Sequence, residues 1–387
     1  MKFTKERRGK MRETRIKVIH ILSDTNIGGA GTLLVNYLKN FDREKFQIKV
    51  ILPKDSLLKP RIESLSYEVI ELLGNQDKSL DFKAIGELRK IFKKEKPDIV
   101  HAHSSMSAKI AAFLCGVKTR MYTRHCAYDP KKFMTVFPFK HINGFINNTL
   151  STHIIAVAQA AKENLTDTGV SDKKITVIIN GVDELLEKTE EEKTAIREKY
   201  GISKDDFLFG IVARLENVKG HDYFIEAANE ISKKYENVKF IIAGTGAEEE
   251  RLKKKVNDLG LSKRVIFAGF VTDVSGIYSI MDMNVNCSWG TETSSLALSE
   301  AMSIGKPAIA SIYGGNPYMI TDGENGLLCE KKNSLALAEK MEYILNNKDV
   351  YQEMCKKARE HYEKKFTAKK MTKSLEEIYE KEYRRNK

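Results

Sequence analysis

The amino-acid sequence predicts an α/β protein with two doubly wound parallel-sheet domains that face each other across a cleft. The first observation behind this prediction is an alternation, along most of the chain, of short apolar runs rich in β-branched residues with longer segments of helical periodicity. The second is a single charged stretch, residues 184–199, that lacks strand character. A chain of 387 residues is long enough for two domains, each with its own hydrophobic core.

Strands are predicted where apolar β-formers cluster between turn residues. In the first half they cover residues 16–22, 46–52, 67–72, 98–103, 119–125, 153–159 and 175–181. A second series covers residues 207–215, 238–243, 265–271, 281–288 and 307–311. The segments between the strands have helical spacing, so the strands of each half are expected to pair in parallel with helices on both faces of the sheet.

This pattern divides the chain into four segments. Residues 1–15 are rich in Lys and Arg and have almost no periodic apolar content, which predicts a mobile basic tail. Residues 16–185 form the first domain, residues 186–360 the second, and residues 361–387 have helical periodicity. Doubly wound sheets bind ligands outside the carboxyl ends of their strands, so the cleft between the domains is the predicted site.

Composition excludes several classes of protein. The chain is 42% hydrophobic and 30% charged, with 7 Pro and 24 Gly, which excludes a disordered or collagen-like chain. Its 5 cysteines are scattered without CxxC pairing, which indicates reduced thiols in a cytoplasmic setting and no zinc site. Because the first ten residues are charged and no run of about 20 apolar residues occurs, the chain is expected to be neither exported nor membrane-spanning.

The net charge favours anionic partners. The excess of 65 Lys and Arg over 53 Asp and Glu gives +12, which suits phosphates, anionic lipid or nucleic acid, although solubility alone explains it equally well. Nucleic acid is not a predicted partner, because no element interleaves aromatic platforms with Arg as known binding modules do.

Two glycine-rich turns, residues 28–31 (GGAG) and 244–246 (GTG), follow predicted strands. Such turns present free backbone N–H groups and are candidate phosphate sites. Neither belongs to a full GxGxxG followed by an acidic residue, which argues against a nicotinamide site. The alternative is a purely structural turn, in which glycine supplies a positive φ or close packing.

Four charged side chains at the ends of predicted strands form a more specific pattern. Arg214 ends a strand and Lys219 precedes the next helix, where two cations can neutralise a departing diphosphate. Glu292 lies in the turn after a later strand, and Glu300 lies inside the helix that follows, where carboxylates can accept hydrogen bonds from sugar hydroxyls. Taken singly, each charge is better explained by a solvated surface or a helix cap, so it is the conjunction that indicates a site.

These residues, taken with their neighbours, resemble a known family. The segments ARLENVKGHDYFIEAA, IIAGTGAEEERLKKKVNDLGLSKRVIFAGFV, ETSSLALSEAMSIGKPAIAS and TDGENGLL resemble the donor-binding domain of glycosyltransferase family 4 (glycosyl transferases group 1), retaining enzymes of the GT-B fold. The IGGAG loop, IVHAHSS, TRH and VIINGVD extend the resemblance over nearly the whole chain after Ile16. The resemblance implies Rossmann-like domains, the N-terminal one for the acceptor and the C-terminal one for a nucleotide-sugar, and a last helix that crosses back to the first domain.

The resemblance also implies catalytic roles for four residues. Glu292 would contact the donor sugar near its reacting carbon, and His125 would face that sugar from across the cleft. Arg214 and Lys219 would stabilise the departing diphosphate. This implies transfer without a metal ion or other cofactor, because the two cations take the charge role that Mg²⁺ fills elsewhere.

Further residues match the family's donor-binding positions. Glu300 would contact the nucleotide ribose, and Gly29 would approach the diphosphate from the first domain. The remaining matches, which would hold the base or offer backbone N–H groups to the phosphates, are Phe270, Val271, Ser294, Ser295 and Leu296. Two departures, residues 293–295 (TSS) in place of glycines and a 314–318 loop (GGNPY) without the usual acidic residue, leave the identity of the sugar open.

His101 and His103, in the run HAH, raise the question of a metal site. We expect these alternate residues to point to opposite faces of their strand, and no third ligand lies nearby in sequence, so no metal is predicted. His103 is expected to form hydrogen bonds within the cleft.

Residues 130–147, PKKFMTVFPFKHINGFIN, mix lysines with large apolar side chains. On a lip of the cleft, such a segment suits a lipid-linked acceptor at an anionic membrane surface. The alternative is an ordinary helix packed on the first sheet.

The sequence therefore predicts a retaining glycosyltransferase that moves a sugar from a nucleoside diphosphate donor, a UDP-sugar, to a hydroxyl of a surface polysaccharide or glycolipid. It is expected in the cytoplasm as a monomer or dimer, with peripheral contact to the inner face of the membrane. A sugar-nucleotide epimerase of the same fold and a noncatalytic binding protein for nucleotide-sugars or nucleic acid are the alternatives. The paired glutamates and the ARLENVKG segment argue against the epimerase.

Overall fold

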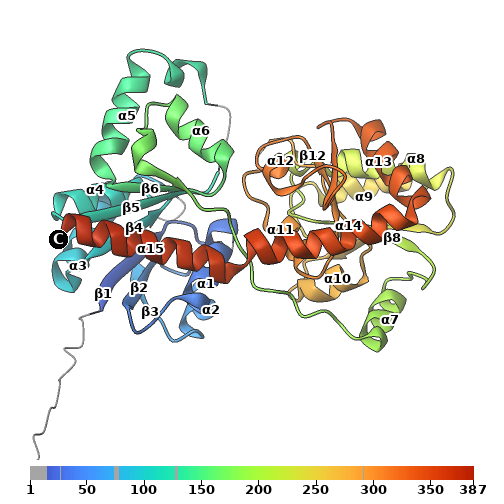
Figure 1. Cartoon of the computed structure of the whole chain (residues 1–387), viewed down its shortest axis with the longest axis horizontal. Coiled ribbons are helices and arrows are strands. Elements are labelled where there is room, and N and C mark those ends of the chain that lie inside the picture. The colour runs from blue at the N-terminus through green and yellow to red at the C-terminus, as the bar shows by residue number, and fades with distance from the viewer. Residues whose placement is uncertain (1–14, 27, 74–77, 127–129, 291) are drawn as a thin grey trace, which may run out of the picture.

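The computed structural model describes residues 15–26, 28–73, 78–126, 130–290 and 292–387. Apart from Arg15, the predicted basic tail lies outside the described residues. The described chain forms two α/β domains that lie side by side (Figure 1). Every strand pairing within the two sheets is parallel, which confirms the predicted fold class.

The first domain is built on a seven-stranded sheet of order β3-β2-β1-β4-β5-β6-β7. Its strands are β1 (Ile16–Leu22), β2 (Phe46–Pro53), β3 (Glu68–Leu72), β4 (Ile99–His103), β5 (Thr119–Arg124), β6 (His153–Ala156) and β7 (Ile175–Val177). Its helical segments are α1 (Gly29–Asn40), α2 (Lys59–Glu63), α3 (Phe82–Glu95), α4 (Met106–Leu114), η1 (Lys132–Thr135), α5 (Phe139–Leu150), α6 (Gln159–Asp167) and η2 (Asp172–Lys174). The strand order reverses between β1 and β4, and the carboxyl edge at such a reversal is where ligands of these sheets bind.

The second domain is built on a six-stranded sheet of order β10-β9-β8-β11-β12-β13. Its strands are β8 (Phe207–Val212), β9 (Val238–Ala243), β10 (Val265–Gly269), β11 (Met283–Asn286), β12 (Ala308–Ser311) and β13 (Gly326–Cys329). Its helical segments are α7 (Glu190–Lys199), η3 (Asn217–Lys219), α8 (His221–Ser232), α9 (Glu249–Asp258), α10 (Val274–Ile280), α11 (Leu296–Ser303), α12 (Asn316–Met319), α13 (Ser334–Asn346) and α14 (Lys348–His361). Strand β13 was not among the predicted strands.

Apolar side chains cover both faces of each sheet, as buried parallel strands require. In the first domain, Val50 packs on one face with helix α1, while Ile51 packs on the other with helix α3. In the second domain, Phe240 and Ile241 divide between the two faces in the same way. This alternation leaves the loops at the carboxyl edges as the places where polar side chains gather.

The C-terminal helices connect the two domains. After α14 the chain passes through a π-helical turn, η4 (Tyr362–Phe366), into α15 (Ala368–Asn386). Figure 1 shows α14 against the second domain and α15, in red, against the first. Leu375 and Tyr379 of α15 are fully buried in the same apolar cluster as Leu33 and Tyr37 of α1. The last helix is therefore part of the first domain's core.

Candidate active site

The carboxyl end of β8 carries two cations. Arg214 has an exposed guanidinium that lies 2.7 Å from the carboxylate of Glu216. Lys219 ends η3, and its Nζ lies 3.1 Å from Oε2 of Glu292. Gly220 then leads into α8 with a φ of 76°, and a Cβ on it would collide with the backbone just after β11. The turn that presents Lys219 therefore requires glycine.

Glu292 is a buried carboxylate that three donors hold in place. Its Oε2 accepts hydrogen bonds from Lys219 Nζ at 3.1 Å, from Ser288 Oγ at 2.8 Å and from Asn286 Nδ2 at 3.3 Å. Its Oε1 makes no hydrogen bond with the described residues and is available to a ligand. Burying either charge alone would be costly, so Lys219 and Glu292 stabilise each other at this position.

The loop after Glu292 leads into α11, whose first residue is Leu296. Ser295 caps the helix through its side chain, and the Ser294 hydroxyl accepts a hydrogen bond at 3.1 Å from the backbone N–H of Asn180, which follows the last strand of the first sheet. A Cβ on Gly315 would collide with the backbone of this loop. The first N–H groups of α11 have no acceptor within the helix, so this tightly held turn is suited to an anion.

Three further residues that were predicted to bind the donor lie around α10, α11 and β10. Within the described residues, Glu300 bonds to none of the donors that hold Glu292. Its Oε2 accepts a hydrogen bond from the Tyr278 hydroxyl at 3.1 Å. Burial raises the pKa of the Glu300 carboxyl above its usual value. Phe270 and Val271 follow β10, and Phe270 is 69% exposed. An exposed aromatic ring beside a strand end is a surface on which a nucleotide base could pack.

The two glycine-rich turns differ in what they require. Gly244 has a φ of 142°, and a Cβ on Gly244 or Gly246 would collide with the backbone of residues 213–215, so this turn is structural. Gly29, the first residue of α1, does not have a positive φ, and a Cβ on it would meet nothing within 4 Å. No described neighbour therefore requires glycine at position 29.

His125 follows β5 at the carboxyl edge of the first sheet. Its Nε2 lies 2.9 Å from Nδ1 of His103, and its Nδ1 makes no hydrogen bond with any described residue. Burial lowers the pKa of His125 to about 4, so its imidazole is neutral at pH 7.

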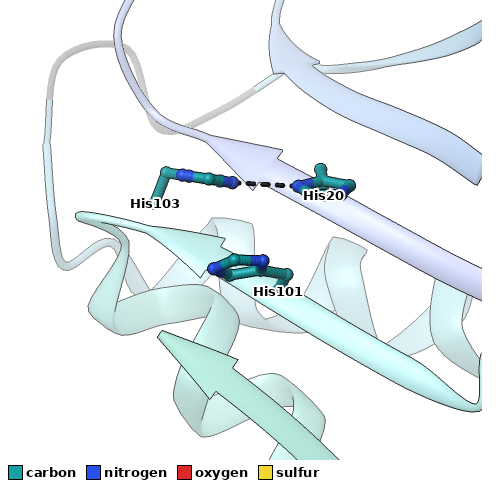
Figure 2. Close-up of side chains that lie close together, drawn as sticks. All are labelled: His20, His101 and His103. Atoms are coloured by element: carbon teal, nitrogen blue, oxygen red, sulfur yellow. Dashed lines mark hydrogen bonds between the residues drawn. The ribbon is translucent and has the colours of Figure 1, made fainter. Parts of the chain in front are cut away.

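The expectation that His101 and His103 point to opposite faces of β4 is wrong. Residues two apart on a strand share a face, and the two rings are stacked with their centroids 4.4 Å apart. His20, from the neighbouring strand β1, joins them (Figure 2), and ligand atoms of the three lie within 4.8 Å of one another. Sequence reasoning missed His20 because the pairing of His20 with His101 in adjacent strands is a tertiary contact.

These three histidines are candidate metal ligands, but their geometry favours hydrogen bonding. His20 Nδ1 lies 2.9 Å from His103 Nε2, and His101 contacts the Tyr379 hydroxyl at 2.5 Å and Thr123 Oγ1 at 2.7 Å. Metal ligands need in-plane lone pairs aimed at one point. The planes of His101 and His103 are only 22° from parallel, so their lone pairs do not converge.

Comparison with known proteins identifies the family. The model of Glycosyltransferase Family 4 matches residues 27–184, and that of Glycosyl transferases group 1 matches residues 192–361. The chain is 31% identical, over 83% of its length and 86% of the relative's, to the UDP-Gal:alpha-D-GlcNAc-diphosphoundecaprenol alpha-1,3-galactosyltransferase of Escherichia coli. The chain belongs to glycosyltransferase family 4.

Other comparisons of this family 4 glycosyltransferase agree. It is 29% identical to the alpha-monoglucosyldiacylglycerol synthase of Acholeplasma laidlawii, over 74% of this chain and 76% of that one. Its structure is similar to that of Anabaena HepE in complex with UDP, with a TM-score of 0.81 and 21% identity over 95% of this chain and 100% of that one. The structural similarity shows that this glycosyltransferase has the GT-B fold.

Proposed function

We propose that this glycosyltransferase is a retaining enzyme that transfers a sugar from a UDP-sugar to a hydroxyl of a polysaccharide or glycolipid, without a metal ion. The observation that carries the proposal is the ion pair of part-buried Lys219 with buried Glu292, 3.1 Å apart beside the N-terminus of α11. The name of the Escherichia coli relative specifies UDP-Gal, and the Anabaena HepE structure holds UDP, which supports a UDP-sugar as the donor.

In the proposed reaction, the bond between the anomeric carbon and the diphosphate oxygen breaks, and the acceptor oxygen bonds to the same face of the sugar. The acceptor's proton goes to the departing diphosphate. Lys219, Arg214 and the first N–H groups of α11 neutralise the charge that develops on that group. Glu292 Oε1 and His125 Nδ1, neither of which bonds to a described residue, are the groups left to orient the sugar.

Nucleotide binding and product analysis test this proposal. UDP should raise the thermal unfolding temperature more than GDP or ADP does, and a panel of sugar donors should include one UDP-sugar from which UDP is released, with or without EDTA. The product linkage, read by NMR, should keep the anomeric configuration of the donor. An inverted product or a requirement for a divalent metal would contradict the mechanism. Conversion of the donor to an isomer would establish the epimerase instead, and no response to any nucleotide would favour a binding protein.

We also propose that one face of α5 contacts an anionic membrane that carries the acceptor. Among the described residues, no helix is both long and apolar enough to cross a membrane. The apolar face of η1 and α5 is formed by the exposed side chains of Phe133, Val136, Phe137, Phe139, Ile142, Phe145 and Ile146. Residues 130–150 contain three lysines and no Asp or Glu. This combination matches a surface that buries rings among acyl chains while its cations meet lipid phosphates.

The opposite face of α5 anchors it to the domain. Gly144 lies so close to the backbone of Gly169 that a Cβ on it would collide. Asn143 Nδ2 donates to the carbonyl of Thr168 at 2.6 Å, and Asn147 Oδ1 accepts from Lys109 at 2.7 Å. Helix α5 therefore packs on the domain through small and polar residues and leaves its large apolar side chains in solvent.

Vesicle flotation tests the membrane proposal. The protein should float with vesicles that contain phosphatidylglycerol and remain unbound with pure phosphatidylcholine. Replacing Phe137 and Phe145, which are 80% and 73% exposed, with Ser should abolish flotation. The matched control is Phe82→Ser, because Phe82 is 82% exposed on α3 of the same domain. Equal flotation of both variants would show that this face does not bind lipid.

A further inference from the structure

The histidine cluster of Figure 2 is part of a longer chain of hydrogen bonds that ends at His125. Its members, in order, are Thr123, His101, Tyr379, His20, His103 and His125, and we refer to them as the buried relay. The five links measure 2.7, 2.5, 3.3, 2.9 and 2.9 Å in that order. All members except His125 are 1% exposed or less. The relay thus runs from the interior of the first domain to the carboxyl edge of its sheet, where His125 follows β5.

Each imidazole in the relay is neutral near pH 7. Burial lowers the pKa of His20 to about 3 and that of His125 to about 4, and it lowers the pKa of His101 and His103 well below the usual value. A neutral imidazole has one N–H and one lone pair. A histidine bonded at both nitrogens therefore donates at one and accepts at the other. If the Tyr379 hydroxyl accepted from both His101 and His20, its own hydrogen would be buried without an acceptor among the described residues, so it accepts from one and donates to the other. All the bonds of the relay then point in one of two directions.

The Thr123 end distinguishes the two directions. In the first, the Thr123 hydroxyl donates to His101 Nε2, and each member donates to the next as far as His125 Nε2. In the second, Thr123 accepts from His101, and its own hydroxyl hydrogen has no acceptor among the described residues, although its side chain is fully buried. A buried donor without an acceptor is costly, so the first direction is favoured.

We propose that the buried relay holds His125 in the tautomer protonated at Nδ1, so that His125 has an N–H donor free for a ligand at the carboxyl edge of the first sheet. In this direction Nε2 of His125 accepts from His103 Nδ1–H and cannot carry the proton. Thr123, His101, Tyr379, His20 and His103 are positioning residues, since they act through His125. The further step, in which this N–H donates to an oxygen of the donor sugar, rests on the proposed function. The tautomer does not depend on the proposed function.

Nitrogen NMR of the full-length chain labelled with ¹⁵N-histidine tests the tautomer directly. His20, His101, His103 and His125 should all be protonated at Nδ1, with His125 assigned by the signal that is lost in His125→Gln. Detection of His125 protonated at Nε2 in the wild-type chain would overturn the proposal. So would binding of one Zn²⁺ per chain that shifts the signals of His20, His101 and His103 together.

Two variants test whether the relay is the cause. His103→Met has a side chain of similar size that can accept but not donate, so His125 should gain the Nε2–H tautomer. Tyr379→Phe breaks the relay between His101 and His20, so His125 should also gain the Nε2–H tautomer. The control is His153→Gln, because His153 is a buried histidine of β6 that bonds to Thr176 at 2.9 Å outside the relay, so His125 should keep its Nδ1–H in that variant. An unchanged His125 in His103→Met would overturn the proposal, and if that variant fails to fold, the wild-type tautomers still decide.

Kinetics separate this proposal from the proposed function. His103→Met should lower kcat for turnover of the sugar donor by about tenfold and change KM for that substrate by less than about twofold. The reason is that the ring of His125 stays in place while its N–H moves to the other nitrogen. If His125→Gln turns over the donor at the wild-type rate, the role of His125 in sugar transfer is wrong, and the spectra alone decide the tautomer.

Discussion

Lowering the pH from 7.5 to 5 should destabilise the first domain, because His20 is neutral in the folded state. Burial lowers its pKa from 6.5 to about 3. Above pH 6.5 both states are neutral and the full stability is present, but below pH 6.5 the unfolded chain takes up a proton that the folded chain does not. The free energy of unfolding then falls by about 1.4 kcal/mol per pH unit, or about 2 kcal/mol at pH 5. His125, with a pKa of about 4, should contribute a similar loss.

Urea unfolding followed by circular dichroism at pH 7.5, 6.5, 5.5 and 5 measures this effect. Glu300 and Glu376 have pKa values raised by burial and act in the opposite direction, so the comparison between variants matters more than the total slope. His20→Gln should make the free energy of unfolding fall less steeply as the pH is lowered. The slope should decrease by up to about 1.4 kcal/mol per pH unit, which corresponds to the uptake of one proton. His141→Gln, at an exposed position on α5, is the matched control. An equal slope in wild type and His20→Gln would show that His20 does not remain neutral in the folded protein.

Three further predictions concern the site and the last helix. Lys219→Met should lower donor turnover at least about 100-fold while the circular dichroism spectrum is retained, and near-normal UDP release would contradict the assigned role. Gly315→Ala should lower the thermal unfolding temperature because its Cβ collides with the loop before α11, whereas Gly29→Ala should leave that temperature unchanged and reduce turnover. Deleting residues 368–387 should cause aggregation, seen by size-exclusion chromatography, because Leu375 and Tyr379 fill the first domain's core. A monodisperse, folded product would show that α15 is dispensable.

Much of the donor side could be predicted from the sequence because its signals are local. Alternating apolar runs and helical periods locate strands and helices, and parallel strands bring their carboxyl ends to one edge of the sheet. Arg214, Lys219 and Glu292 could therefore be assigned to one edge before any contact was known. The same local reasoning failed for His101 and His103, where the two-residue period of a strand places both rings on one face.

The two-sheet architecture and the edge at which the charged residues gather could be predicted from the sequence, since both depend on short-range patterns. Which side chains touch became known from the folded structure alone. Lys219 meets Glu292 across 73 residues, and His20 meets Tyr379 across 359. The exposure of the apolar side chains of α5 also could not be predicted, because their spacing fits a helix packed on the sheet as well as one that faces a membrane. Contacts and exposure depend on which segments distant in the chain lie side by side, and no local pattern encodes that neighbourhood.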